Sequence, residues 1–582
     1  MIDKTIQLDS EIGSIKIMNL VEIAKNKAPI EMFYHWEKER PTSVYLRQPI
    51  DNVWHDYTWA DVSYRVRRLT AALYEMGLQR GDKVSILSKN CAEWLITDLA
   101  LQLGGFVSVP MYFDLTPETM TYVLEHSEAK ALFVGKLDKP VWDRLKPAVP
   151  SNIKQIAFSY HGDDGDFKRD DFEYKLMDMV EANEPFTESP VPDDEDIWTM
   201  VYTSGTTGYP KGAVHCYRAP RFVGERSIKA FGLTEQERAL SFLPLAHVAE
   251  RLLVATASVY CSGQVNFVQS LNTFQRDLCE VQPTLFFSVP RLWKKFQGGI
   301  LEKMPQEKLD VMLRIPILRK IVAKKLRGKL GLAEARMVIS GAAPIAPALL
   351  EWYKKVGVEI LEGYGMTENF AYGCIGRPDA NKMGTVGLPM EGCGFKISEE
   401  GEILFKSPTL MKEYYKAPDK TAEALTEDGY YRTGDLGEVD AQGFVKISGR
   451  SKEIFKTEKG EYVAPAPIEG KVSSFKDFEQ ICLGGIGLAQ PILVATLTEQ
   501  GQTKPQSELT AAIAAHITNL NKELLNHEKI GGVVIAAEDW LPDTGMVTPT
   551  LKIKRNKVEE RYADMMLKIT QSKDAVLWEK SA

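Results

Sequence analysis

Residues 203–212 read Thr203-Ser204-Gly205-Thr206-Thr207-Gly208-Tyr209-Pro210-Lys211-Gly212, directly after the short apolar run of residues 198–202. Glycines and small hydroxyl side chains leave backbone N–H groups open to an anion, and Lys211 adds a compact positive charge. The segment is not a Walker A loop, because Pro210 and Gly212 stand where that pattern needs glycine and Ser or Thr. A flexible turn between two strands is the plainer alternative. We favour a strand that ends in a phosphate-binding loop.

Length and composition indicate an ordinary globular protein with more than one domain. The 582 residues, 44% apolar and 26% charged, are too many for a single hydrophobic core. The net charge of −8 argues against a nucleic-acid partner. The seven cysteines are scattered, with no CxxC pair, and are typical of reduced cytosolic thiols. There is no secretory signal pattern, and no apolar run reaches the ~20 residues of a membrane-spanning helix. We therefore expect a soluble, cytoplasmic protein.

Strand and helix patterns alternate through the first part of the chain. Strands are predicted at the apolar runs 83–87, 106–110, 131–134, 265–268, 285–288 and 337–340. A helix is predicted over residues 93–103, and another is expected to begin at Pro117 with Thr116 as its N-cap. Strands that alternate with helices of this length imply βαβ units. The sheet should therefore be parallel and covered by helices on both faces.

The chain is expected to divide into two domains of unequal size. Polar residues at 161–171 and 193–196 predict surface loops ahead of the phosphate loop. From Gly401 onward the pattern changes to short strands with glycine turns, and the step Gly449-Arg450 opens a charged segment. We place the boundary there, with a large domain over residues 1–449 and a small α+β domain over residues 450–582.

Six further segments join the decapeptide in a recognisable order. They are Leu243-Pro244-Leu245-Ala246-His247, Ser340-Gly341-Ala342-Ala343-Pro344, Gly363-Tyr364-Gly365-Met366-Thr367-Glu368, Tyr431-Arg432-Thr433-Gly434-Asp435, Gly449-Arg450-Ser451-Lys452-Glu453 and Thr548-Pro549-Thr550-Leu551-Lys552-Ile553-Lys554-Arg555. Each segment alone is a weak to moderate signal, whereas seven in one order are very hard to obtain by accident. Together they closely resemble the motifs of the acyl-adenylate-forming, AMP-binding superfamily. Within it, the sequence is most similar to the long-chain fatty acyl-CoA synthetases.

This resemblance implies both a fold and a reaction. The fold is α/β, with a large N-terminal domain of αβαβα-type layered subdomains plus a β-rich subdomain, and a small mobile α+β C-terminal domain. The substrates are a medium- to long-chain fatty acid, ATP with Mg²⁺, and coenzyme A. The fatty carboxylate attacks the α-phosphorus of ATP, and the thiol of coenzyme A then displaces AMP from acyl-AMP. Because the carboxylate is already ionised, the first step needs positioning and charge neutralisation instead of a general base.

The resemblance also assigns the nucleotide site. Its positions are Thr203, Ser204, Gly205, Thr206, Thr207, Gly208, Lys211, Gly341, Ala342, Ala343, Gly363, Tyr364, Gly365, Met366, Thr367, Asp435, Arg450 and Lys552. Tyr364 would cover the adenine, Thr367 would lie near the α-phosphate, and Asp435 would accept hydrogen bonds from both ribose hydroxyls. Glu368 would help to hold Mg²⁺, a hard ion that prefers oxygen ligands. Packing of Tyr364 in a turn, and turn capping by Asp435, are the structural alternatives.

The predicted catalytic residues are Lys552, Thr367 and His247. By resemblance, Lys552 enters the site in the adenylation step and bridges the carboxylate and the α-phosphate. Its basic neighbours fit a solvated surface equally well. His247 matches a histidine beside the acyl and thiol tunnel, and a hydrogen-bonded core histidine is the alternative. By resemblance, Lys452 is the hinge about which the small domain swings between the half-reactions. Lys456 and Gly460 lie in the coenzyme A-facing segment that faces the site in the thioester-forming state. Ordinary loop residues are the alternative for all three.

Three features depart from the family pattern or extend it. Residues 317–329 form a basic amphipathic pattern that fits a helix on anionic lipid, or equally a solvated surface helix. Gly470 stands where the family usually has asparagine, which predicts a weaker start to the local helix. Residues 248–254 hold no clear counterpart of the tryptophan gate of some bacterial relatives.

Three hypotheses of function remain open at this stage. The first is an acyl-CoA synthetase, which releases pyrophosphate, AMP and acyl-CoA. The second is a fatty acyl-AMP ligase that hands its acyl group to a carrier-protein thiol. The third is a catalytically silent homologue, whose sign would be the loss of Lys552, Glu368 or the decapeptide, all of which are intact. Oligomeric state and acyl-chain preference do not follow from the sequence.

Overall fold

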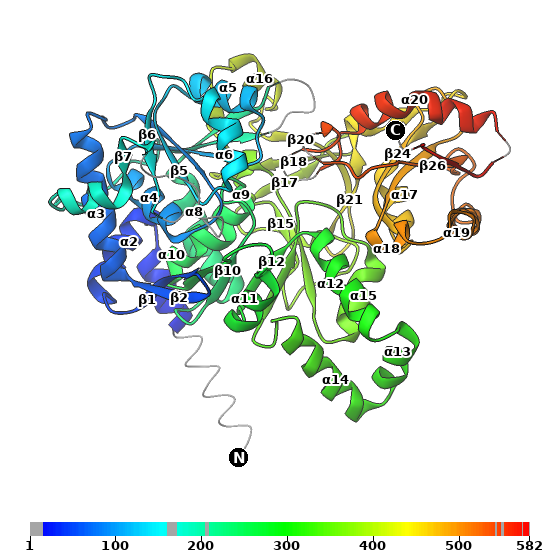
Figure 1. The fold of residues 1–582 in the computed structure, drawn as a ribbon, viewed down its shortest axis with the longest axis horizontal. Coiled ribbons are helices and arrows are strands. Elements are labelled where there is room, and N and C mark those ends of the chain that lie inside the picture. The colour runs from blue at the N-terminus through cyan, green and yellow to red at the C-terminus, as the bar shows by residue number, and fades with distance from the viewer. Residues whose placement is uncertain are drawn as a thin grey trace.

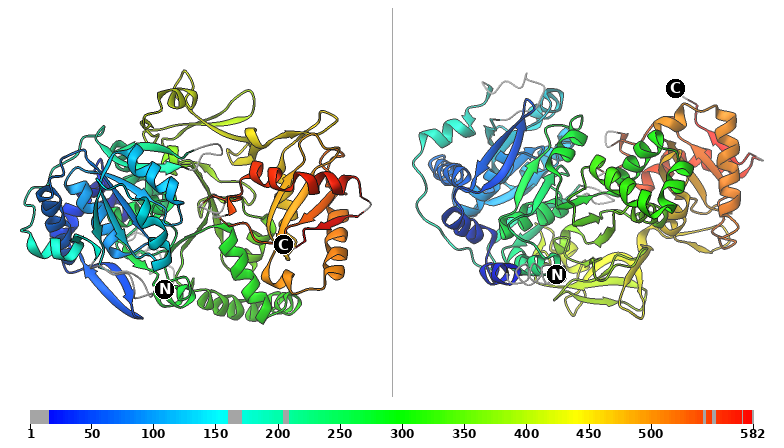
Figure 2. Two further views of the ribbon diagram at one scale, coloured as in Figure 1. Left: turned by 45° about the horizontal axis from the view of Figure 1, so that its top comes forward. Right: turned by 90° about the horizontal axis from the view of Figure 1, so that it is seen from below.

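The computed structural model describes residues 16–159, 171–203, 209–541, 544–548, 552–572 and 574–580. The blue-to-green part of the chain forms one large layered body in Figure 1, and the orange-to-red part forms a smaller one beside it. Both views of Figure 2 keep the C-terminal part on the side opposite the blue N-terminal part. A large α/β domain followed by a small one is therefore confirmed, whereas the boundary at residues 449–450 stays a prediction.

The first large sheet has eight strands within the described ranges, in the order β19-β9-β8-β4-β3-β5-β6-β7. The strands from β8 through β7 pair in parallel, as the alternating pattern predicts. The strands β8, β9 and β19 are antiparallel. The bounds are β3 Lys83–Ser88, β4 Val107–Met111, β5 Ala129–Gly135, β6 Lys154–Ala157, β7 Tyr174–Lys175, β8 Ile197–Thr203, β9 Lys211–Cys216 and β19 Glu413–Tyr414.

The second large sheet has nine strands in the part of the chain that the structure describes, in the order β16-β15-β14-β13-β12-β10-β11-β1-β2. Its central strands, from β14 through β1, are parallel. The bounds are β1 Val44–Ile50, β2 Val53–Thr58, β10 Arg238–Ser241, β11 Gln264–Phe267, β12 Leu285–Ser288, β13 Met337–Ser340, β14 Ile360–Tyr364, β15 Cys374–Ile375 and β16 Leu388–Pro389.

The alternation of side chains along the strands shows which helices cover which face of each sheet. In β5, Ala131 and Phe133 join the core between the two sheets, whereas Leu132 and Val134 join an outer core. Successive side chains of a strand point to opposite faces, so each sheet is covered on both sides. The middle layer contains α2 Pro29–Glu39, α3 Trp59–Glu75, α4 Ala92–Leu103, α8 Arg218–Phe231 and α10 Ala257–Cys261. The outer layers contain α5 Pro117–Ser127 and α6 Lys139–Leu145 on one sheet, and α11 Phe274–Val281, α12 Pro290–Lys303, α14 Pro316–Lys329 and α15 Pro347–Lys355 on the other. The predicted αβαβα layering is confirmed.

Two smaller units follow. The predicted β-rich subdomain is a sheet of β17 Gly394–Ile397, β18 Glu402–Lys406, β20 Tyr431–Val439 and β21 Val445–Arg450. The C-terminal domain is built on β24 Phe478–Gly484, β25 Ile492–Leu497, β26 Gly532–Ile535 and β27 Val576–Trp578. Helices α17 Pro465–Val472 and α19 Gln506–Leu520 cover one face of that sheet, and α20 Arg555–Thr570 covers the other. A hairpin of β22 Phe455–Lys456 and β23 Tyr462–Val463 precedes it.

Local predictions mostly agree with these elements. Thr116 caps α5, because its hydroxyl oxygen accepts a hydrogen bond from the Thr119 N–H at 3.3 Å. Residues 193–196 form an irregular loop as predicted, whereas residues 161–170 lie outside the described ranges. Helix α17 forms with Gly470 inside it, and a side chain there would meet open space. None of the described helices is both long and apolar enough to cross a bilayer.

Candidate active site

Three predicted motifs leave the nine-stranded sheet at one edge. The strands β10, β13 and β14 belong to one parallel array, so their carboxyl ends lie on the same edge, where ligands bind in open α/β sheets. The segments that follow them are residues 242–247, 341–344 and 365–368. A Cβ atom on Gly341 would lie 2.9 Å from the carbonyl oxygen of Gly363, so glycine lets these two motifs approach each other. Ala342 adopts a left-handed φ of 66°, and Ala343 beside it is exposed.

The turn after β14 is tightly packed. The Met366 N–H donates to the Asn369 side-chain oxygen at 2.9 Å, and Thr367 opens a short 3-10 helix, η4 Thr367–Asn369. A Cβ atom on Gly365 would lie 2.6 Å from the carbonyl carbon and oxygen of Ala371, closer than real Cβ atoms come to a backbone. The glycine is therefore required by a close approach of two backbone segments.

Replacing Gly365 with alanine should destabilise the large domain by about 1–3 kcal/mol, the usual cost of overpacking. The new Cβ atom would meet backbone that cannot rotate away, so the turn carrying Thr367 would have to shift. Calorimetric unfolding of the variant should show a lower transition temperature. Gly363→Ala is the matched control for stability, since its nearest atoms would be at 3.7 Å. Equal transition temperatures for the two variants would contradict this account.

Asp435 is the centre of a polar cluster on β20. Its carboxylate accepts a hydrogen bond from the Tyr364 hydroxyl at 2.6 Å and pairs with the Arg450 Nε atom at 2.9 Å. Asp435 and Arg450 face each other across β20 and β21, which fixes the geometry of the pair. Only 4% of Asp435 is exposed. Each carboxylate oxygen can accept more than one hydrogen bond, so both can still receive ribose hydroxyls.

A second cluster joins the phosphate-loop lysine to the predicted magnesium residue. The ammonium group of Lys211 lies 3.7 Å from the centroid of the Tyr414 ring, and the Tyr414 hydroxyl donates to Glu368 at 2.7 Å. Burial lowers the pKa of Lys211, the Lys452 cation lowers it further, and Glu368 acts in the opposite direction. Thr203 pairs with Lys211 across β8 and β9. The positions Ser204, Gly205, Thr206, Thr207 and Gly208 lie outside the described residues.

The Glu368 carboxylate suits a magnesium ion that binds together with the phosphates of a nucleotide. Mg²⁺ usually binds one or two carboxylates together with substrate phosphates and water, so Glu368 can serve as its protein ligand. Within the described ranges, no group of three or more His, Cys, Asp or Glu side chains could hold a metal by itself. A bound Mg²⁺ would neutralise charge on the phosphates.

Lys552 comes to this site from the C-terminal domain. Its backbone N–H donates to the Thr548 hydroxyl at 3.1 Å, and residues 549–551 lie outside the described ranges. The residue is accessible to solvent, yet protein surrounds its ammonium group closely enough that lost hydration is the main cause of a lowered pKa. The Arg450 cation lowers this pKa further, whereas Asp435 and Glu368 raise it. Lys552 therefore lies within electrostatic range of these residues of the large domain.

His247 lies within electrostatic range of Lys552. Its ring Nδ1 atom accepts a hydrogen bond from the Ala249 N–H at 3.2 Å, where it caps the short helix α9 Val248–Glu250. Burial lowers the pKa of His247 to about 3, and the Lys552 cation contributes to this. His247 is therefore neutral near pH 7, with its orientation fixed by the cap. The residues 248–254 of the absent tryptophan gate form α9 and part of a π-helical segment, η3 Arg251–Thr256.

Not every predicted residue reaches the site. Lys452 opens the link to the small domain within η5 Ser451–Glu453, near enough to Lys211 to lower its pKa. In the described structure, Lys456 and Gly460 belong instead to the hairpin β22–β23. There the Lys456 ammonium group lies 4.7 Å from the centroid of the Tyr462 ring. The structure does not bring Lys456 and Gly460 to the nucleotide cluster.

Tyr414 is a site residue that the sequence did not reveal. It belongs to β19, an edge strand of the eight-stranded sheet, and contacts both Lys211 and Glu368. Its hydroxyl also lies 3.3 Å from that of Tyr431. The only local signal is a pair of tyrosines between lysines, a pattern typical of exposed surface. The role of Tyr414 depends on strand pairing across about two hundred residues, which local patterns do not reveal.

Comparison with known proteins agrees with this architecture. The family model of the AMP-binding enzymes matches residues 33–415, and that of the AMP-binding enzyme C-terminal domain matches residues 453–573. The chain belongs to the AMP-binding enzyme family.

Curated relatives are similar over nearly their full length. The chain is 31% identical to the long-chain-fatty-acid–CoA ligase FadD15 of Mycobacterium bovis, covering 91% of this chain and 95% of that protein. It is 28% identical to the fatty acyl-CoA synthetase A of Dictyostelium discoideum, over 87% and 85% of the two chains. Among solved structures, the adenylation domain of a Mycobacterium chelonae carboxylate reductase superposes with a TM-score of 0.79, at 20% identity and 97% coverage of both chains. That likeness shows a shared fold.

Proposed function

We propose that the protein is an ATP-dependent acyl-CoA ligase that activates medium- to long-chain fatty acids through an acyl-AMP intermediate. The observation that carries the proposal is that Lys552, from the small domain, lies within electrostatic range of Glu368 and Asp435 of the large domain. The long-chain-fatty-acid–CoA ligase relatives support the choice of substrate. ATP with Mg²⁺ and coenzyme A are the co-substrates.

The first half-reaction joins two anions, and the site supplies cations for it. A fatty carboxylate oxygen bonds to the α-phosphorus of ATP while the bond to the pyrophosphate oxygen breaks. We assign Lys552 to the reacting carboxylate and α-phosphate, and Lys211 to the departing pyrophosphate. Fixed charges in a partly dehydrated site stabilise such a transition state more than water does. Asp435, Arg450 and Tyr364 would hold the ribose and adenine in place.

The second half-reaction transfers the acyl group to a thiol. The thiolate of coenzyme A attacks the acyl carbon of acyl-AMP, and AMP leaves with the former carboxylate oxygen. An unperturbed thiol has a pKa of about 8.5, so nearby positive charge favours the reactive thiolate. We propose that residues 450–582 rotate about Lys452 between the half-reactions, which would carry Lys456 and Gly460 to the site in place of Lys552.

Product analysis tests the proposed function directly. Purified protein with ATP, Mg²⁺, a long-chain fatty acid and coenzyme A should release pyrophosphate, AMP and acyl-CoA in equal amounts. Release of ADP would exclude the proposal. Accumulation of acyl-AMP with little acyl-CoA would instead favour the fatty acyl-AMP ligase that delivers to a carrier protein.

We further propose a cytoplasmic location with peripheral contact to anionic membrane. The surface concerned is the helix pair α13 Gln306–Arg314 and α14, which projects from the lower edge of the molecule in Figure 1. Its exposed apolar side chains are Val311, Ile315, Ile317 and Ile321, between 47% and 74% exposed. Residues 306–329 carry eight basic and two acidic side chains, in a chain with a net charge of −8. Isoleucines surrounded by lysines and arginines suit the boundary of an anionic bilayer.

Vesicle sedimentation tests this surface. Wild-type protein should sediment with vesicles that contain phosphatidylglycerol and much less with phosphatidylcholine alone. Ile317→Glu combined with Ile321→Glu should weaken binding to the anionic vesicles by about tenfold or more, because charge replaces apolar groups at the boundary. Leu271→Glu is the matched control, since Leu271 is 85% exposed elsewhere. If the double variant bound the anionic vesicles as strongly as wild-type protein does, the proposed contact would be contradicted.

A further inference from the structure

Asn90 joins the two large sheets behind the proposed active site. It stands between β3 and α4 and is only 5% exposed. Its side-chain NH₂ group donates to the Ser241 hydroxyl at 2.8 Å and to the Leu243 carbonyl oxygen at 2.6 Å. Its side-chain oxygen accepts from the Leu245 N–H at 3.1 Å. One buried side chain of the eight-stranded sheet therefore holds the backbone that leaves β10 of the other sheet.

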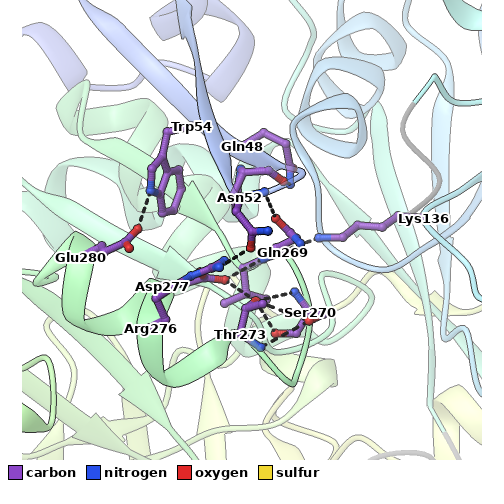
Figure 3. Close-up of polar contacts among 12 residues, drawn as sticks. Gln48, Asn52, Trp54, Lys136, Gln269, Ser270, Thr273, Arg276, Asp277 and Glu280 are labelled. Atoms are coloured by element: carbon purple, nitrogen blue, oxygen red, sulfur yellow. Dashed lines mark hydrogen bonds and ion pairs between the residues drawn. The ribbon is translucent and has the colours of Figure 1, made fainter. Parts of the chain in front are cut away.

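The backbone of Asn90 is itself anchored. The ammonium group of Lys136, 3% exposed at the end of β5, donates to the Asn90 carbonyl oxygen at 3.0 Å and to the Val268 carbonyl oxygen at 2.5 Å. Figure 3 shows Lys136 reaching toward the loop that carries Gln269. That loop is held in turn, because the Gln269 N–H donates to Asp277 at 2.9 Å. Asn90 thus lies on a rigid support.

The segment that Asn90 holds leads directly to His247. The His247 N–H donates to the Pro244 carbonyl oxygen at 2.8 Å, so the turn between Leu243 and His247 is closed on itself. Glu250, one helical turn later, accepts from the Ser241 hydroxyl at 2.8 Å and from the Phe242 N–H at 3.2 Å. Burial raises the pKa of Glu250 to about 8, so this carboxyl group is mostly protonated at neutral pH. The hydrogen-bonding groups of this network can therefore find partners while the Glu250 carboxyl group is neutral, so no buried charge is needed.

We propose that Asn90 is a positioning residue for the ligase reaction, because it fixes residues 243–245 and thereby the place of His247 at the candidate active site. This inference rests on the proposed function. In this proposal Asn90 acts without touching substrate, since its buried side chain is engaged by Ser241, Leu243 and Leu245. Its effect on the rate passes through the His247 turn, whereas nucleotide contacts at Asp435 and Lys211 belong to other segments.

A double-mutant cycle separates positioning from a merely structural role. Asn90→Ala should lower kcat for acyl-CoA formation by about tenfold in the otherwise unaltered enzyme, and by less than about twofold in a His247→Ala background. The KM for ATP should change by less than about twofold, because the substitution leaves the residues that bind the nucleotide in place. Asn90→Ser keeps a smaller polar side chain and so loses only part of the hydrogen bonds of Asn90. Its loss of kcat should be smaller than that of Asn90→Ala, and it should again nearly disappear in the His247→Ala background. This variant takes the place of Asn90→Ala if Asn90→Ala does not fold.

Thr70→Val is the matched control. Thr70 is fully buried and donates to the Ala100 carbonyl oxygen of α4 at 3.0 Å, away from the His247 turn. Its effect on kcat should be the same in both backgrounds. Equal losses for the Asn90 variants in both backgrounds, or unchanged kcat, would overturn the inference alone. Wild-type enzyme that forms no acyl-CoA would overturn the proposed function and this inference with it.

Discussion

Replacing Lys552 with alanine should lower the rate of acyl-adenylate formation by about 10²–10³-fold, the scale for losing one fixed charge-stabilising group. The charges of Arg450, Asp435 and Glu368 all act on the Lys552 ammonium group, and a nucleotide phosphate bound there would be its anionic partner. Formation of acyl-CoA from supplied acyl-AMP should fall much less, because the α-phosphate bond is already made. Single-turnover measurements of the two half-reactions provide the comparison.

The Lys552 variant should not lose stability. The residue is exposed, and lost hydration together with the Arg450 cation lowers the pKa of its ammonium group, so this charge contributes little to folding stability. The unfolding temperature should stay equal or rise slightly. Lys557→Ala is the matched control on the same basic segment, since Lys557 forms only an exposed ion pair with Glu560 at 2.8 Å. Equal losses in both half-reactions for Lys552→Ala would contradict its assigned role.

Replacing Asp435 with alanine should lower kcat/KM for ATP by about 10²-fold or more, since hydrogen bonds to a charged group contribute about 1.5–3 kcal/mol each. Two ribose hydroxyls would lose their acceptor, and Arg450 would lose the partner that lies 2.9 Å from it. Most of the loss should appear in the KM for ATP, because ribose contacts exist before and during the reaction. The KM for the fatty acid should change little.

Tyr364→Phe tests whether Asp435 binds the ribose itself or only holds the Tyr364 hydroxyl. It removes the hydroxyl that donates to Asp435 at 2.6 Å and keeps the aromatic ring. Its effect on the KM for ATP should stay within about tenfold, the upper end for one ordinary hydrogen bond, because Asp435 remains to accept the ribose hydroxyls. An effect as large as that of Asp435→Ala would mean that Asp435 serves only to hold Tyr364.

The large domain could be predicted from the sequence because its strands are continuous apolar runs with clear ends. The strand β3 follows Gly81 and Asp82, and β4 carries Pro110, while Thr116 and Pro117 mark the start of α5. The site could be predicted because parallel strands deliver their following loops to one edge. The motifs at His247, Ala342 and Thr367 therefore meet although they are far apart in the chain.

Contacts between distant elements could not be predicted in this way. Tyr414 reaches Glu368 through the pairing of β19 with β9, and Asn90 reaches Leu243 across two sheets. Neither residue carries a local signal, because its partners are chosen by packing. The prediction that Lys456 and Gly460 face the site concerns the thioester-forming state, and it stays a prediction. In the described structure both residues belong to the β22–β23 hairpin, whereas Lys552 lies within electrostatic range of Asp435 and Glu368.

Following the fatty acid's carboxylate oxygens into the products tests acyl-adenylate formation most directly. A long-chain fatty acid with both carboxylate oxygens replaced by a heavy isotope should be incubated with the protein, ATP, Mg²⁺ and coenzyme A. If the carboxylate attacks the α-phosphorus, mass spectrometry should find one heavy oxygen in AMP and one in acyl-CoA. Heavy oxygen in ADP or inorganic phosphate, or AMP without the label, would contradict acyl-adenylate formation at this site.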